Sequence, residues 1–391
     1  MLAELALDKH TPEESIAELV DTVKHSPERR DVLVQLLPER ISLYDGRSAN
    51  ATVRMRGYIL AAFEQTGLPD AALPYVLEEL ENGRDAYLVA GAAKALRGLD
   101  TPTNRVVPFL RKAAENIEYS DDALTFERYK PRWPITNYTT ALTEICRTFG
   151  WLGAHAKSAV PYLEALREDR LDELSRPGVE IKNAIDRIRT DGRAAHDCCG
   201  TVPVNPGLMV HSLQKKHRKD LSISDIELED QAGNTLTFGT FFSCKPSIVV
   251  FFYTRCDNPN KCSLTVTKLA RLQKAIGEEQ LEGLLRTAAI TYDPEYDLPR
   301  RLKAYGENRG VIFSDDNRMF RARSGFRELQ EYFQLGVNFT GSTVNRHRIE
   351  LFIFDSRGDI TATFTRLQWD VQDVLEQAKA LLGSVQSVGR R

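Results

Sequence analysis

The sequence lacks long hydrophobic runs and a marked excess of either charge. No apolar stretch approaches the roughly 18 residues that a membrane-spanning helix needs. The formal net charge of -3 gives no basic field that would attract a nucleic acid. The first residues, MLAELALDKHTPEES, contain neither the basic region nor the long apolar region of a secretory signal. We therefore expect no membrane span, no nucleic-acid partner and a cytoplasmic location, or a periplasmic one if a leader precedes this sequence.

Cysteine is also scarce, since the 391 residues contain only six. Six cysteines in a chain of this length do not form a disulfide scaffold, so free thiols or metal ligands are favoured. The length predicts at least two domains. Hydrophobic residues make up 42% and charged residues 27%, which is typical of globular domains.

The first half of the chain has a helical pattern and an internal repeat. Amphipathic helices are expected at 51–65, 87–96, 138–151 and 179–188. An apolar–Pro–aromatic–apolar motif opens a helix at Pro74, Pro108 and Pro161, and the first two prolines are 34 residues apart. This period is typical of stacked helical repeats, so we interpret residues 1–190 as a HEAT-like solenoid. The alternative is an unrelated helical bundle. No catalytic constellation stands out, so this region is expected to bind a protein partner.

Residues 191–219 have the glycine and proline content of a linker. His196, Cys198 and Cys199 lie close together in it and offer soft metal donors. We hypothesise that this segment carries metal or reducing equivalents to a site in the second domain. The alternative is a pair of exposed thiols without a role.

The chemistry of the second domain centres on residues 247–273. Ile248 to Tyr253 is an unbroken apolar run, which predicts a buried central strand. Cys256 follows in a turn, and Cys262 stands where a helical pattern begins. The N-terminus of a helix stabilises a thiolate and lowers its pKa. This placement is typical of a redox thiol or a soft-metal ligand.

Strands and helices alternate through the rest of the chain. A hairpin is expected from 223–228 and 236–238, and further strands at 285–291, 310–313, 349–354 and 359–364. Helices are expected at 299–305, 326–333 and 371–382. This order predicts a thioredoxin-like α/β domain at 220–391, which makes the chain a multidomain α plus α/β protein.

Three segments of this domain resemble the Sco/SenC family of thioredoxin-fold copper chaperones. They are FFYTRC with the second cysteine and its helix, residues 290–299 (ITYDPEYDLP), and residues 347–355 (HRIELFIFD). The resemblance covers roughly residues 220–383. The family spaces its cysteines C-x3-C and places proline after the second, whereas this chain has C-x5-C followed by Ser263.

The resemblance implies that Cys256, Cys262 and His347 bind a metal together. Two thiolates and an imidazole suit Cu(I), with Zn(II) as the alternative, and they exclude hard cations. Asp293 and Asp297 are interpreted as caps for the helix after Pro299, or else as groups that orient the site.

Three functions follow as hypotheses. The first is a copper-binding accessory protein or metallochaperone that docks a partner through its helical repeats. The second is a thiol–disulfide oxidoreductase or thiol peroxidase that uses Cys256 and Cys262 as catalytic residues. The third is an interaction scaffold with an inactive thioredoxin-like domain.

Overall fold

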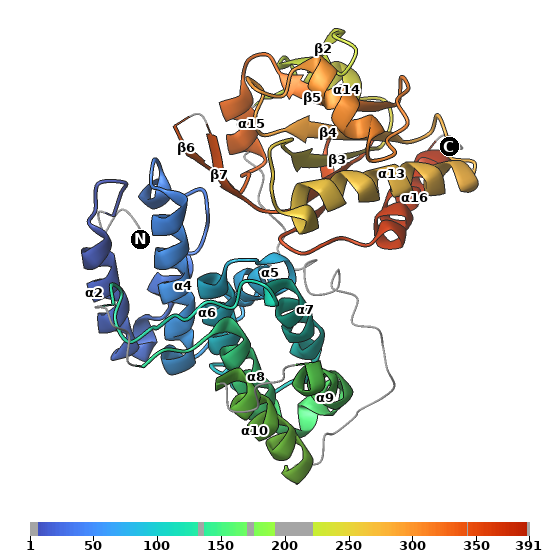
Figure 1. Ribbon diagram of the computed structural model, residues 1–391. Coiled ribbons are helices and arrows are strands. Elements are labelled where there is room, and N and C mark those ends of the chain that lie inside the picture. The colour runs from blue at the N-terminus through green and yellow to red at the C-terminus, as the bar shows by residue number, and fades with distance from the viewer. Residues whose placement is uncertain (1–6, 132–136, 170–175, 192–221, 342, 389–391) are drawn as a thin grey trace. The chain divides into compact units, whose positions relative to one another are not determined.

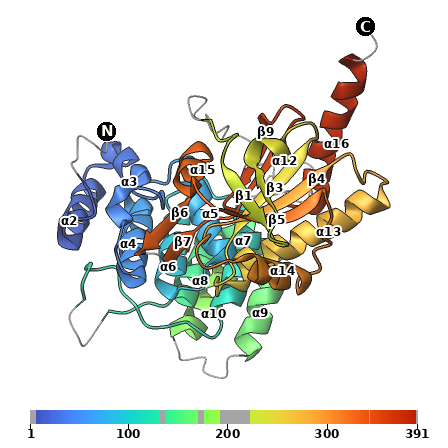
Figure 2. The same cartoon turned by 90° about the horizontal axis from the view of Figure 1, so that it is seen from above.

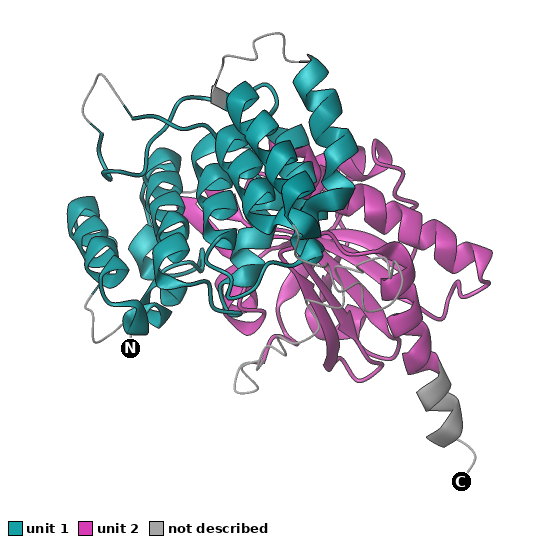
Figure 3. Cartoon of the chain, turned by 90° about the horizontal axis from the view of Figure 1, so that it is seen from below, with its two compact units in different colours: residues 1–204 teal, residues 205–391 magenta. Residues whose placement is uncertain are grey.

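The structure is a computed structural model that describes residues 7–131, 137–169, 176–191, 222–341 and 343–388. The chain divides into two compact units, Met1–Val204 and Asn205–Arg391 (Figure 3). This division lies within the interval 191–219 that we interpret as a linker. Cys198 and Cys199 lie outside the described residues, so the linker and its proposed role stay predictions.

The N-terminal unit is built from helices in its described part. The α-helices are α2 (Glu13–Lys24), α3 (Asp31–Gln35), α4 (Ala49–Thr66), α5 (Leu73–Asn82), α6 (Ala86–Leu96), α7 (Val107–Ile117), α8 (Ala141–Leu152), α9 (Val160–Asp169) and α10 (Arg176–Thr190). Short 3₁₀ turns occur at η1 (Pro27–Arg29), η2 (Ser42–Tyr44), η3 (Asn104–Val106) and η4 (Gly153–Ala159). The helices predicted from the sequence pattern are confirmed within a few residues at each end.

These helices pack in a regular succession (Figure 1). Helix α4 packs on α6, α6 on α8 and α8 on α10, while α5 packs on α6 and α7. The three apolar–Pro–aromatic motifs open α5, α7 and α9, as predicted. Small residues allow α4 and α6 to approach closely, because a Cβ added at Gly91 would meet the Gly57 carbonyl oxygen at 2.6 Å. The helical character of this unit is confirmed, and its identity as a HEAT-like solenoid stays a prediction.

The C-terminal unit is an α/β domain around a seven-stranded sheet in the order β2-β1-β5-β4-β3-β8-β9 (Figure 2). Its strands are β1 (Glu227–Asp230), β2 (Thr235–Thr237), β3 (Ser247–Phe252), β4 (Arg286–Thr291), β5 (Asn317–Ala322), β8 (Glu350–Phe354) and β9 (Ile360–Thr365). Strands β3, β4 and β5 are parallel, and β8 and β9 continue the sheet antiparallel. A separate hairpin joins β6 (Val337–Thr340) to β7 (Thr343–His347).

The central strand β3 is buried at all six positions, as its apolar run predicted. Burying a large apolar side chain contributes about 1.5–3 kcal/mol. The remaining helices are α12 (Phe238–Phe242), α13 (Leu264–Glu278), α14 (Pro299–Glu307), α15 (Phe326–Tyr332) and α16 (Val371–Val388). Helix α13 follows β3 and packs against α16 (Figure 1). Cys256 therefore follows the carboxyl end of a fully buried central strand.

One expected strand was wrong, and one hairpin was not predicted. Residues 310–313 do not form a strand, because the Val311 amide donates to Gly306 and the Ile312 amide to the Gln273 side chain instead of to a sheet. The strand lies at β5, where Met319 and Phe320 are buried. The hairpin that was not predicted is β6–β7, and His347 is its last residue, just before β8.

In the part of the chain that the structure describes, no helix combines the length and the apolar character needed to cross a membrane.

Candidate functional site

Cys256, Cys262 and His347 converge at the end of β3. Cys256 Sγ lies 3.3 Å from His347 Nε2, and Cys262 Sγ lies 3.4 Å from the same nitrogen. One donor atom from each residue lies within 4.8 Å of the other two. Among the described residues, these three form the one such group of Cys, His and acidic side chains. The structure thus brings the predicted residues together, and their roles as ligands or catalysts stay a prediction.

The loop between the cysteines is shaped by its own side chains. Asn258 precedes a short π-helical turn, η5 (Pro259–Ser263), and its Oδ1 accepts a hydrogen bond from the Asn260 amide at 2.9 Å. Pro259 fits the first position of this turn because that position needs no N–H donor. Helix α13 continues directly from η5. The π turn takes up the long C-x5-C spacing and places Cys262 at the start of the helix, where it is buried.

His347 is held with one ring nitrogen engaged and the other directed at the sulfurs. Its side chain is buried, and Nδ1 lies 3.2 Å from the Arg348 carbonyl oxygen. A carbonyl oxygen only accepts, so Nδ1 carries a proton in this hydrogen bond. Nε2 faces the two sulfurs, where it can donate to the Cys256 thiolate or, after releasing that proton, offer its lone pair to a metal ion. This is the arrangement of a metal-binding histidine, whose second nitrogen is fixed by a hydrogen bond.

Two tyrosines enclose the imidazole. The Tyr253 ring meets it edge-on at 5.1 Å between centroids, and the Tyr292 ring lies at 5.6 Å. Both tyrosines are buried, so they keep water from this side of His347. Burial, followed by the nearby Cys256 and Cys262, raises the pKa of Tyr253, which therefore remains a neutral phenol at physiological pH.

A buried polar network lies behind Tyr292. The Tyr292 hydroxyl donates to Glu350 Oε2 at 2.7 Å, and Arg348 Nε donates to Glu350 Oε1 at 2.6 Å. Glu350 is fully buried, so its charge requires these partners. Sequence analysis missed this network. The signal that was present is the charged pair Arg348 and Glu350 flanking Ile349 directly after the histidine.

The two thiols have opposite electrostatic environments. A hydrogen bond from Cys262 and the nearby His347 lower the pKa of Cys256 to about 3, against the opposing effect of burial. Burial raises the pKa of Cys262, and the adjacent Cys256 raises it further. The pair therefore holds one thiolate, on the more accessible Cys256, and one thiol, on the buried Cys262. Sequence reasoning predicted a lowered pKa at the helix N-terminus, but the structure lowers it at the other cysteine.

Asp293 and Asp297 do not cap α14, so the capping interpretation was wrong. The residue preceding α14 is Leu298, and no side chain caps this end of the helix. Asp297 instead accepts hydrogen bonds from the Thr254 amide at 3.1 Å, from the Thr254 hydroxyl and from Thr291. It thereby links the ends of β3 and β4 directly before Cys256. Asp293 pairs with the Arg255 guanidinium.

We expect Asp297→Ala to lower the free energy of unfolding of the C-terminal unit by about 1–3 kcal/mol, because it leaves buried donors without an acceptor. Asp315→Ala is the control, since the Asp315 side chain is fully exposed in its ion pair with Arg318 and such pairs contribute about 0–1 kcal/mol. Urea denaturation of the full chain measures both variants. Equal stability of the two variants would contradict a stabilising role for the hydrogen bonds that Asp297 accepts from Thr254 and Thr291.

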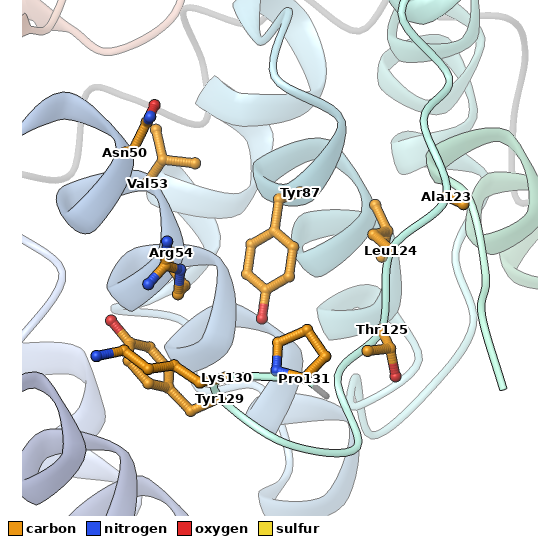
Figure 4. Close-up of a pocket in the computed structure, with 10 residues that line it drawn as sticks. All are labelled: Asn50, Val53, Arg54, Tyr87, Ala123, Leu124, Thr125, Tyr129, Lys130 and Pro131. Atoms are coloured by element: carbon orange, nitrogen blue, oxygen red, sulfur yellow. The ribbon is translucent and has the colours of Figure 1, made fainter. Parts of the chain in front are cut away.

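The N-terminal unit contains a pocket of about 460 Å³ (Figure 4). Side chains of α4 and α6 and of residues 123–131 line it, and the Tyr87 ring projects between Arg54 and Leu124. Two of its polar lining groups are paired, since the Tyr129 hydroxyl donates to Glu13 and Lys130 pairs with Glu14, whereas the buried Tyr87 hydroxyl has no hydrogen-bond partner among the described residues. No cysteine or histidine is among the described residues that line it, so this pocket offers no soft-metal donor.

Part of this chain is similar to proteins of known structure. No curated protein matches the chain. Similar solved structures include a SCO1/SenC family lipoprotein from Bacillus anthracis, at 20% identity and a TM-score of 0.36, covering 42% of this chain and 99% of that one. Copper-bound ScoI from Bradyrhizobium japonicum is 17% identical with a TM-score of 0.33, covering 40% and 96%. Copper-bound yeast Sco1 is 19% identical with a TM-score of 0.32, covering 42% and 93%.

The likeness to a family rests on the sequence match and not on these scores. The model of the family described as SCO1/SenC matches residues 214–383, which lie within the C-terminal unit and include Cys256, Cys262 and His347. The expected resemblance is therefore confirmed over this interval, and residues 214–383 are similar to the SCO1/SenC family.

Proposed function

We propose that the C-terminal unit binds Cu(I) through Cys256, Cys262 and His347 and acts as a copper-binding accessory protein or metallochaperone. The observation that carries this proposal is the position of His347 Nε2, which faces both sulfur atoms at 3.3 and 3.4 Å. Two sulfurs and one imidazole nitrogen form a soft donor set that matches Cu(I). The copper-bound ScoI and Sco1 structures support the proposal by likeness.

The coordination chemistry also defines what the site would do with the ion. Three donors leave positions through which a partner's ligands can approach, and this suits a metal that is passed on. Zn(II) accepts the same donors and is the competing ion. Metal analysis of protein purified anaerobically, with and without Cys256→Ser, tests the proposal.

A thiol–disulfide oxidoreductase, or a thiol peroxidase, is the second candidate. The observation that favours it is the asymmetry of the two cysteines, with an accessible thiolate at Cys256 beside a buried thiol at Cys262. Such a pair can attack a substrate disulfide through Cys256, and Cys262 can then resolve the mixed disulfide. Turnover of a disulfide or peroxide by metal-free protein would favour this function.

We further propose that the N-terminal unit is the platform for a protein partner, since stacked helices present long binding surfaces. Residues 1–191 expressed alone should be strongly helical by circular dichroism and should retain a partner of the full chain in a pull-down. Residues 220–391 are the matched control. Retention by the control alone would contradict the platform and would leave the scaffold hypothesis without support. The cytoplasmic location inferred from the N-terminal sequence stays a prediction.

A further inference from the structure

A buried lysine lies between the two cysteines in sequence and contacts the histidine. Lys261 belongs to η5, and its Nζ donates to the His347 carbonyl oxygen at 3.0 Å. Only 8% of this residue is exposed, although it lies in a loop at the edge of the domain. Burying an ammonium group costs free energy unless hydrogen bonds compensate. Hydrogen bonds within the protein, including the one to the His347 carbonyl, therefore hold the Lys261 ammonium group in its buried position.

This hydrogen bond joins the two parts of the site. One part is the C-x5-C loop, and the other is the backbone that follows β7. The Arg348 amide donates to the Gly336 carbonyl at 2.9 Å, and the Arg348 carbonyl oxygen accepts from the His347 ring. The Tyr292 hydroxyl, which donates to Glu350, lies 3.3 Å from the same carbonyl oxygen. The orientation of the imidazole thus depends on a backbone segment that Lys261 contacts directly.

A second contact holds the same loop from another direction. The Gln368 side chain donates to the Asn260 carbonyl oxygen, so two consecutive loop residues are fixed to separate segments. A longer loop has more conformations to restrict, and its closure costs more entropy. The C-x5-C loop therefore needs attachments that hold both sulfurs toward the histidine.

We propose that Lys261 is a positioning residue that fixes the C-x5-C loop and His347 relative to each other, so that both sulfurs and Nε2 can bind one ion. The inference rests on the proposed function of the three residues as a ligand set. Lys261 does not bind the metal itself, because its nitrogen is used by the His347 carbonyl. The hydrogen bond acts by holding the donor atoms in place before the ion arrives.

The test is Lys261→Met in the full chain, with Lys268→Met as the matched control. Lys268 also donates to a backbone carbonyl, at Trp369 and 2.7 Å, but this carbonyl does not belong to a ligand residue. We expect Lys261→Met to weaken Cu(I) binding by about 10–100-fold in anaerobic chelator competition, the range of supporting contacts around metal ligands. X-ray absorption of the bound copper should show a weakened nitrogen contribution. Lys268→Met should bind Cu(I) as the unchanged chain does.

A readout without copper tests the same inference. The ¹⁵N resonances of the His347 ring in metal-free protein should show one fixed ring position in the unchanged chain, and they should shift or broaden in Lys261→Met. Lys261→Arg keeps a long cationic donor and should restore both the affinity and the single ring position. Should Lys261→Met not fold, Lys261→Gln, which is too short to reach the carbonyl, should give the same losses.

The outcomes separate the inference from the proposed function. Failure of the unchanged chain to bind Cu(I) would overturn the proposed function, and the ¹⁵N pattern would still decide the role of Lys261. Equal affinity and unchanged His347 ring resonances in Lys261→Met would overturn the inference. Lower affinity with unchanged ring resonances would also overturn it, because that pattern is expected from the charge of Lys261 alone.

Discussion

Replacing Cys256 by serine should lower the affinity for Cu(I) by at least about 100-fold, the upper end of what losing a supporting residue costs. Serine keeps the size of the side chain but supplies a hard hydroxyl in place of a soft thiolate, and Cu(I) prefers the thiolate. Cys256 is also the cysteine that already carries the negative charge, because its pKa is lowered. Chelator competition and metal analysis under anaerobic conditions measure the loss.

Cys244→Ser is the control for this experiment. Cys244 is an exposed thiol of the same unit and does not belong to the cluster of three donors. The Cys244→Ser variant should still bind one Cu(I) per chain. Copper that is lost equally from both variants would indicate adventitious binding to exposed thiols and would contradict the proposed site.

Alkylation of Cys256 by iodoacetamide should be nearly independent of pH between 8 and 5. The pKa of Cys256 is lowered to about 3 from the ordinary 9.0, so the thiolate persists throughout this range. An ordinary thiol loses about tenfold in rate for each pH unit below its pKa, as its thiolate fraction falls. A low pKa also reduces nucleophilicity, with a Brønsted coefficient of about 0.4–0.5, so the net advantage of Cys256 at pH 5 is about 20-fold.

Mass spectrometry of the alkylated peptides separates Cys256 from the exposed Cys244, which serves as an internal reference. Cys262→Ala removes the hydrogen bond that is the largest cause of the lowered pKa. In this variant the rate at Cys256 should fall with pH below neutrality. A rate at Cys256 of the unchanged chain that falls about tenfold per pH unit below pH 8 would mean that Cys256 is an ordinary thiol and would remove the basis of the redox candidate.

The parts of the fold with strong local patterns could be predicted from the sequence. The apolar run before Cys256 predicted β3 because a run of six apolar residues is stable only when both faces of the strand are covered. The expected strand at 310–313 was wrong for the opposite reason. Its apolar run is short, Ile312 is 62% exposed, and side chains and helix ends provide its hydrogen bonds.

The sequence was sufficient to predict which three residues form the candidate site. It was not sufficient to predict their charges and hydrogen bonds. The cysteines and the histidine stand in recognisable sequence surroundings, so their convergence followed from the family resemblance. The thiolate at Cys256, the placement of His347 between the sulfurs and the burial of Glu350 beside Tyr292 depend on contacts between segments far apart in the chain. A sequence pattern gives no direct signal for such contacts.

The π turn at η5 affects how sites of two cysteines and one histidine can be recognised in a sequence. It absorbs two residues more than the usual family spacing while both sulfurs still face one histidine nitrogen. Fixed cysteine spacing is therefore a poor criterion for a search, because a pattern that demanded C-x3-C would overlook this chain. A better criterion is a buried strand, two cysteines joined by a loop of variable length, and a histidine at the end of a distant hairpin.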